Sequence, residues 1–185
     1  MEKLHTYRKH QIPSEFAWQI VSYQRIQWPF LHGKSNQGWD YMPREMPAIS
    51  FILADEQMLI SHASVNQRMI EFAGEQLNCY GLSSVFTYPA FRKGGYASRV
   101  VKAATDQILQ SDADLAMLFC GQPLRAFYSA CQWEPADNAR IFYGDKNNPT
   151  FKSDNLVMML FVSDKARRLR PRITTEPVFV GPITW

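Results

Sequence analysis

The chain has 185 residues, of which 46% are hydrophobic and 20% are charged, and its formal net charge is +3. This composition is ordinary for a folded soluble protein, so we expect a single domain over residues 1–185. The weak positive charge argues against a dedicated nucleic-acid-binding protein, and no apolar run reaches the length needed to span a membrane.

The cysteines point to a reducing compartment. Cys79, Cys120 and Cys131 are odd in number and lack the spacing of metal ligands, so we expect buried thiols and no metal site. No apolar segment of the kind found in secretory signals follows Met1. The sequence therefore predicts a cytoplasmic protein.

The first third of the chain predicts a strand, a helix and a long irregular segment. Leu4 to Arg8 can form a strand, and an apolar face with helical spacing begins at Pro13 and continues to Ile26. The segment from Trp28 to Pro47 is rich in aromatic residues, which is typical of a loop that covers a ligand. Trp39, Asp40 and Tyr41 are candidates for substrate contact, although a structural hydrophobic plug explains the segment at least as well.

Three strand-like stretches follow, from Ala48 to Leu53, from Met58 to Ile70 and from Leu77 to Tyr88. Short turns separate them, as in an antiparallel meander. A meander that leads into a helix favours an α+β fold rather than a dinucleotide-binding α/β unit.

A basic glycine turn comes next, between the third of these strands and a helix. Pro89 should end the strand, Gly94 and Gly95 permit positive φ, and apolar spacing predicts a helix from Tyr96 to Gln110. A helix N-terminus beside Arg92 and Lys93 suits a phosphate or pyrophosphate group. An ordinary strand-turn-helix junction accounts for the same residues about equally well.

The remaining chain predicts a buried parallel strand, Asp114 to Cys120, and a short helix, Pro123 to Ala130. Two further strands, Arg140 to Tyr143 and Leu156 to Val162, flank a flexible loop. Residues 170–185 are expected to form a proline-containing tail. The basic run from Lys165 to Arg172 is better explained as a solvated face or linker than as a binding site for nucleic acid or an anionic cofactor.

The glycine turn resembles a known signature. The segment Arg92-Lys93-Gly94-Gly95-Tyr96-Ala97 matches the [Q/R]-x-x-G-x-[G/A] acyl-CoA motif of the Gcn5-related N-acetyltransferases (GNAT), again after a strand. The segment from Phe127 to Trp133 resembles the F/L-Y-x-x-x-G-F segment of that family, with Gln132 where glycine is usual. The order of elements is similar over essentially the whole chain. The resemblance implies a mixed, mostly antiparallel sheet flanked by helices and splayed between the fourth and fifth strands.

This resemblance also implies a cosubstrate, acetyl-CoA, and a set of residues that bind it. Backbone N–H groups of the turn would hold the pyrophosphate, and the strand before it would pair with the pantetheine arm. The implied cofactor-binding residues are Val85, Phe86, Thr87, Arg92, Lys93, Gly94, Gly95, Tyr96, Ala97 and Ser98. Tyr128 would act as general acid toward the CoA thiolate, since a phenol keeps its proton at neutral pH. Without the family, core packing is the more probable role of this tyrosine.

Within the family, the aminoglycoside 2'-N-acetyltransferase branch is the most similar, through residues 62–68, 77–81 and 127–133 and the C-terminal tryptophan. That branch implies substrate binding by the carboxylate of Trp185, for which a frayed terminus is the alternative. It carries a glutamate base where this chain has Ser83, which can only order a water. His62, Glu71 and Glu75 are the other candidates for the base.

We therefore expect direct transfer of an acetyl group to the primary amine of a small molecule, in a ternary complex. The absence of a nucleophilic Cys-His pair argues against a covalent acyl-enzyme, for which Cys120 is the remaining candidate. A catalytically degenerate CoA-binding or sensing protein of the same fold is the alternative, because the strand carboxylate is missing. Members of this fold family often form homodimers. We therefore expect a homodimer, although the sequence does not identify its interface.

Overall fold

The computed structural model describes residues 1–29, 47–152 and 155–184. These residues divide into two compact units. The first unit combines Met1–Asn66 with Ser84–Ala104, and the second combines Gln67–Ser83 with Thr105–Trp185. Two long strands and one helix contain residues of both units. The single domain that we expect over residues 1–185 stays a prediction.

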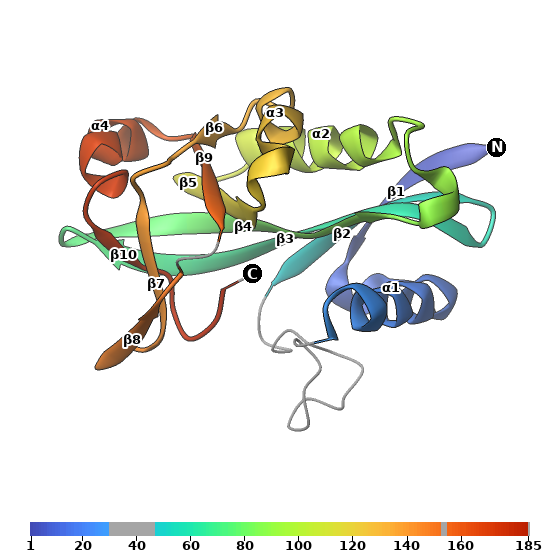
Figure 1. Cartoon of the computed structure of the whole chain (residues 1–185), viewed down its shortest axis with the longest axis horizontal. Helices are drawn as coiled ribbons and strands as arrows, with labels where there is room; N and C mark the ends of the chain where they lie inside the picture. Colours follow the sequence, from blue (N-terminus) through green and yellow to red (C-terminus); the bar gives the residue numbers. More distant parts are fainter. Residues whose placement is uncertain (30–46, 153–154, 185) are drawn as a thin grey trace. The chain divides into compact units, whose positions relative to one another are not determined.

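The first unit is an antiparallel meander covered by helices (Figure 1). Strand β1 (Glu2–Arg8) pairs with β2 (Ala48–Asp55), and β2 pairs with β3 (Met58–Phe72). Helix α1 (Ser14–Gln27) lies on one face of these strands, and the first turns of α2 (Tyr96–Leu109) lie on the opposite face. The apolar periodicity read from the sequence thus places each helix on the sheet.

Helix α1 packs through the apolar positions that the sequence spaces along one side. Phe16, Ile20 and Tyr23 are buried against a cluster that includes Ile52 and Phe86. Burying a side chain of this size stabilises a fold by about 1.5–3 kcal/mol. The cluster therefore fixes α1 against the end of strand β4 (Glu75–Thr87), the strand that leads to the glycine turn.

The second unit holds the beginning of β4 and the strands that follow it. Strand β5 (Leu115–Cys120) runs parallel to β4, and β9 (Leu156–Phe161) pairs antiparallel with both β5 and β6 (Glu134–Pro135). A second, smaller sheet contains β7 (Arg140–Asp145), β8 (Asn148–Phe151) and β10 (Pro177–Phe179). Helix α3 (Arg125–Ser129) follows β5, and α4 (Asp164–Ile173) follows β9.

The hydrogen-bonding order of the large sheet is β1-β2-β3-β4-β5-β9-β6, and that of the small sheet is β10-β7-β8. Strands β4 and β5 of the large sheet are parallel, as the sequence predicts. Their pairing ends at Gly81 and Met117, although β4 continues to Thr87 and β5 to Cys120. The expected splay between the fourth and fifth strands is thereby confirmed, together with the mixed sheet flanked by helices.

Two expectations about the second half differ from the structure. The segment expected as a flexible loop closes a hairpin, because Asp145 pairs with Asn148 and the Asp145 carboxylate accepts the backbone N–H of Asn147. The expected tail begins inside a helix, since α4 continues to Ile173. Pro171 lies in the last turn of α4, where its missing N–H removes a single helical hydrogen bond. Ser163 caps the other end by accepting the N–H of Ala166.

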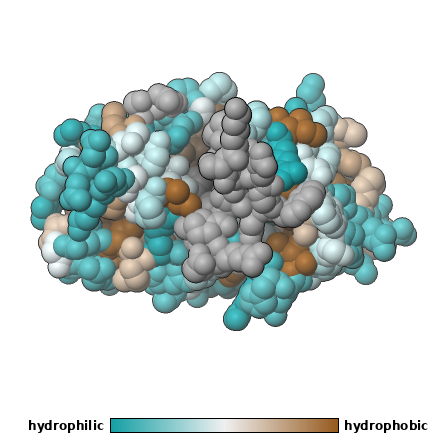
Figure 2. All heavy atoms as spheres, turned by 90° about the horizontal axis from the view of Figure 1, so that it is seen from below, coloured by the Kyte–Doolittle hydropathy of each residue, from teal (hydrophilic) through white to brown (hydrophobic). Residues whose placement is uncertain are grey.

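Figure 2 shows the face that lies at the bottom of Figure 1. This face is mostly hydrophilic, and its apolar residues form small separate patches. No helix in the described ranges is both long and apolar enough to cross a membrane.

Candidate functional site

The glycine turn lies in the first unit, where the sequence predicts it. Strand β4 ends at Thr87, residues Pro89–Phe91 form a short 3-10 turn, and α2 begins at Tyr96. The four residues between them, Arg92 to Gly95, are exposed. The first turn of α2 contains no acidic residue, so its N-terminal dipole is not cancelled by its own side chains. This arrangement can receive an anionic group.

Both glycines of the turn fit their surroundings for different reasons, Gly95 by its backbone conformation and Gly94 by its contact with a side chain. Gly95 has φ of +75°, a region that side-chain-bearing residues rarely adopt, and the space around it is open. A Cβ on Gly94 would lie 2.6 Å from Cε2 of Tyr96, which is closer than real contacts allow. Lys93 also has positive φ, +70°. The turn therefore combines an exposed backbone with left-handed conformations at Lys93 and Gly95.

Arg92 connects the turn to the end of β4 and to α1. Its Nε donates to the Thr87 carbonyl at 3.3 Å, and its terminal nitrogen donates to the Tyr23 hydroxyl at 2.7 Å. Tyr23 in turn stacks on Phe86 with ring centroids 4.4 Å apart. The guanidinium is thus engaged by protein groups, and its expected contact with a phosphate stays a prediction.

The start of α2 is tied to β1 by a contact that the sequence does not reveal. The Tyr96 hydroxyl and the Arg99 guanidinium each donate to the Glu2 carboxylate at 2.6 Å. These two contacts, the Tyr96 hydrogen bond first, lower the pKa of Glu2. Ala97 and Ser98 complete the first turn of α2 and are half-buried. Glu2 is 94 positions from Tyr96, so no local pattern could have identified the pair.

The end of β4 contains an irregularity next to the residues expected to contact pantetheine. Ser84 has φ of +51°, although it lies inside a strand. Val85 and Thr87 are half-buried, whereas the Phe86 side chain is buried in the α1 cluster. The Phe86 side chain therefore packs in the core, and any role of this residue in binding would come from its backbone.

His62 was one of the sequence candidates for a general base, and its surroundings argue against that role. It is 1% exposed, and burial lowers its pKa to about 4, although the hydrogen bond with the Ser84 carbonyl acts in the opposite direction. Its ring nitrogens lie 2.8 Å from the Ser84 carbonyl oxygen and 3.2 Å from the Ser50 hydroxyl. A ring with both nitrogens engaged in the protein interior is poorly placed to take a proton from a substrate.

Tyr128 lies in the second unit, on α3, and is 6% exposed. Burial, with smaller contributions from Cys120 and Cys131, raises the pKa of its hydroxyl. The ring packs edge-on against Phe127 with centroids 4.8 Å apart. This tyrosine keeps its proton across the physiological pH range, which suits both a proton donor and a buried core residue.

The helix that carries Tyr128 ends in a left-handed cap. The N–H of Trp133 donates to the Tyr128 carbonyl at 3.2 Å, and the N–H of Gln132 donates to the Ser129 carbonyl at 3.1 Å. Gln132 has φ of +74°. This is the hydrogen-bond pattern of a Schellman motif, whose left-handed position normally takes glycine. The left-handed cap explains why the GNAT segment that residues 127–133 resemble usually has glycine at the position of Gln132.

Apart from Glu71, the remaining candidates for acid-base or nucleophilic chemistry lie in protein-paired or buried positions. Ser83 is 8% exposed, and Glu75 is paired with Arg168 at 3.0 Å. Glu71 is exposed. The three cysteines are buried and form no disulfide, and burial raises the pKa of Cys79 to about 12 and also raises that of Cys120. Raised thiol pKa values disfavour a cysteine nucleophile.

Four predicted substrate contacts, Trp39, Asp40, Tyr41 and Trp185, lie outside the described residues. Within those residues, no group of three or more His, Cys, Asp or Glu side chains is arranged to hold a metal ion.

The basic run on α4 is paired within the second unit. Its ion pairs are Lys165–Asp114, Arg167–Asp164, Arg168–Glu75, Arg170–Glu134 and Arg172–Glu176. These carboxylates offset the positive charge of the run, which supports its interpretation as a solvated face.

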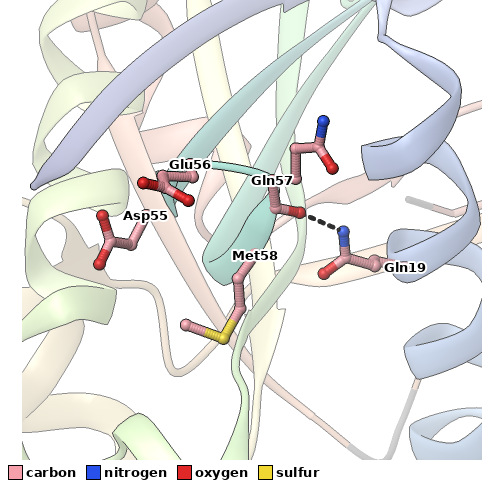
Figure 3. A pocket seen from close by; sticks show the side chains of 5 residues that line it. All are labelled: Gln19, Asp55, Glu56, Gln57 and Met58. Carbon is pink, nitrogen blue, oxygen red and sulfur yellow. Dashed lines mark hydrogen bonds between the residues drawn. The ribbon is translucent and has the colours of Figure 1, made fainter.

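A hollow in the first unit, at the β2–β3 turn, has a structural explanation (Figure 3). The Gln19 side chain donates to the Gln57 carbonyl at 2.7 Å and accepts the Leu59 N–H at 2.9 Å, so it fastens the hairpin to α1. Asp55, on the rim, accepts a hydrogen bond from the amino group of Met1.

Comparison with known proteins agrees with this fold. The chain is similar to the Escherichia coli GNAT family N-acetyltransferase YhbS in complex with CoA (17% identity, TM-score 0.61, 96% of this chain and 88% of that one). It is also similar to an aminoglycoside 6'-N-acetyltransferase complexed with coenzyme A (13% identity, TM-score 0.56, 87% and 97%). A probable N-acyltransferase from Enterococcus faecalis is longer (17% identity, TM-score 0.56, 73% of this chain), and the chain spans only 32% of it.

At these identities the similarity shows the fold alone, and no curated protein matches the sequence significantly. The family comparison goes further, because the acetyltransferase (GNAT) domain matches residues 8–136, more than half of the chain. The match includes the glycine turn and Tyr128. The chain belongs to the GNAT acetyltransferase family and is an N-acetyltransferase.

Proposed function

We propose that this protein transfers the acetyl group of acetyl-CoA to the primary amine of a small molecule, directly and in a ternary complex. The observation that carries the proposal is the exposed glycine turn between β4 and α2. It joins a strand end, a positive-φ glycine and a helix N-terminus without acidic residues in its first turn. These features are what a pyrophosphate needs from a protein backbone.

The cosubstrate would be held mainly by backbone groups of the first unit. The N–H groups of Lys93, Gly94, Gly95 and Ala97 would bind the pyrophosphate, and Val85 and Thr87 would pair with the pantetheine arm as a short added strand. The loss of β4–β5 pairing after Gly81 supports this role, since the following residues of β4 lack β5 as a partner. The solved complexes of similar folds with CoA support it as well.

The transfer itself breaks the thioester C–S bond and forms an amide C–N bond. A backbone N–H near the end of β4 would polarise the acyl carbonyl. Tyr128 would give its proton to the departing thiolate, and Ser83 would order the water that accepts the proton lost by the amine. The raised pKa of Tyr128 keeps it protonated until that step.

We propose an amino sugar, such as an aminoglycoside, as the acyl acceptor. Two observations support this class: the sequence segments that resemble the 2'-N-acetyltransferase branch, and the structural similarity to an aminoglycoside 6'-N-acetyltransferase. Trp39, Asp40 and Trp185 are the proposed substrate contacts. The cytoplasmic location and the homodimer remain predictions from the sequence.

The proposal is tested by measuring thiol release from acetyl-CoA with a panel of aminoglycosides, polyamines and amino acids. We expect amine-dependent release that falls about a hundredfold in Tyr128→Phe. Tyr80→Phe is the matched control, because the Tyr80 hydroxyl serves a structural bond to Asp112 at 2.8 Å. Its turnover should stay near that of the wild type. Binding of acetyl-CoA without release by any amine would contradict the proposal and favour a CoA-sensing protein.

A further inference from the structure

A buried histidine faces the irregular residue of β4. His62 lies on β3, and its Nδ1 is 2.8 Å from the Ser84 carbonyl oxygen. A carbonyl oxygen can only accept, so Nδ1 carries the hydrogen of this bond. In the neutral ring Nε2 then accepts from the Ser50 hydroxyl, 3.2 Å away. The partners of the ring thus define a single tautomer.

Ser84 is held from two sides in a conformation that it would not adopt on its own. A residue other than glycine at φ of +51° is strained and persists only where its surroundings hold it. Its carbonyl accepts from His62, and its hydroxyl accepts from the Gln24 side chain at 3.1 Å. Gln24 is 2% exposed and comes from α1. Two buried side chains from different elements therefore secure this one backbone position.

The direction of the next N–H group follows from peptide geometry. The described residues contain no cis peptide bond, and in a trans peptide the C=O and the following N–H point in opposite directions. Because the Ser84 carbonyl points to His62, the N–H of Val85 points away from it. Val85 lies beyond Gly81, where the pairing of β4 with β5 ends.

We propose that His62 is a positioning residue for acetyl transfer: its Nδ1–H holds the Ser84–Val85 peptide so that the Val85 N–H is presented to the acyl carbonyl oxygen. The proposal rests on the proposed function and assigns one donor to the polarising step. His62 exchanges no proton with the substrate. It acts through the backbone that it holds.

Two substitutions separate this role from general stabilisation. His62→Leu removes the donor, and we expect kcat to fall by about tenfold or more while KM for acetyl-CoA changes by less than about threefold. His62→Asn places an amide N–H near the position of Nδ1 and should recover most of the lost kcat. Ile20→Ala, in the core cluster of the same unit, is the control for lost stability and should keep the wild-type kcat.

The tautomer gives a readout independent of turnover. In ¹⁵N NMR spectra of the wild-type protein near neutral pH, His62 should be neutral with its hydrogen on Nδ1. A hydrogen on Nε2, or a folded His62→Leu protein with wild-type kcat, would overturn the inference. If His62→Leu does not fold, the kcat of His62→Asn and the tautomer decide. A wild-type protein without acetyltransferase activity would instead refute the proposed function itself.

Discussion

Acidification should destabilise this protein through His62 before most carboxylates titrate. The pKa of His62 is about 4 in the folded state against 6.5 for a free histidine, mainly because the ring is buried. As pH falls, the unfolded chain binds the proton first, so stability is fully present above about pH 6.5 and is lost towards about pH 4. Between about pH 7.5 and about pH 5 the loss is about 2 kcal/mol, approaching about 3 kcal/mol below both pKa values.

The assay is urea unfolding followed by tryptophan fluorescence at a series of pH values. His62→Asn is the comparison, because asparagine keeps a donor toward Ser84 and does not titrate. The difference between the two stability curves isolates His62 from the other ionisable groups. Equal losses of stability in the wild type and His62→Asn would refute the reasoning and mean that the folded protein accommodates a charged ring at this position.

Two further predictions concern the second unit. Gln132→Gly should raise the free energy of unfolding by about 1 kcal/mol, since Gln132 occupies a left-handed cap. The control is Gln110→Gly, at a position without positive φ, which should give no gain in the same urea assay. Asp114→Asn should lower stability by about 2–3 kcal/mol, because the carboxylate accepts from Asn78, Ser163 and Lys165 at 2.7–2.8 Å. Burial alone would raise the pKa of Asp114, but Lys165 and Ser163 lower it overall, so this contribution is present above the unfolded pKa and is lost as pH falls through the lower folded value. An Asp114→Asn protein as stable as the wild type near neutral pH would contradict this assignment.

Much of the fold could be predicted from the spacing of apolar residues and from the positions of proline and glycine. The apolar spacing of α1 and α2 and Pro89 as a strand end indicate local structure that the tertiary fold keeps. The glycine turn was predictable for the same reason, since Gly95 is needed for a positive φ within a few residues of chain.

The misjudged and missed features depend on context that short patterns lack. Pro171 reads as a helix breaker, yet it is tolerated in the last turn of α4, where one missing N–H costs little. The contact of Glu2 with Tyr96 and the hydrogen bond of His62 with the Ser84 carbonyl join residues far apart in sequence. A residue of β4 with positive φ that is not glycine, Ser84, has no signature in the sequence at all.

The central claim is that the glycine turn binds acetyl-CoA, and calorimetric titration with acetyl-CoA tests it most directly. The wild type should bind, and Gly95→Glu should abolish binding by placing a carboxylate and a strained backbone at the pyrophosphate position. Gly74→Glu is the matched control, because Gly74 has a similar φ of +81° and equally open surroundings but lies in the β3–β4 turn. Its binding should equal that of the wild type. Undiminished binding by a folded Gly95→Glu protein, or no binding by the wild type, would contradict the account.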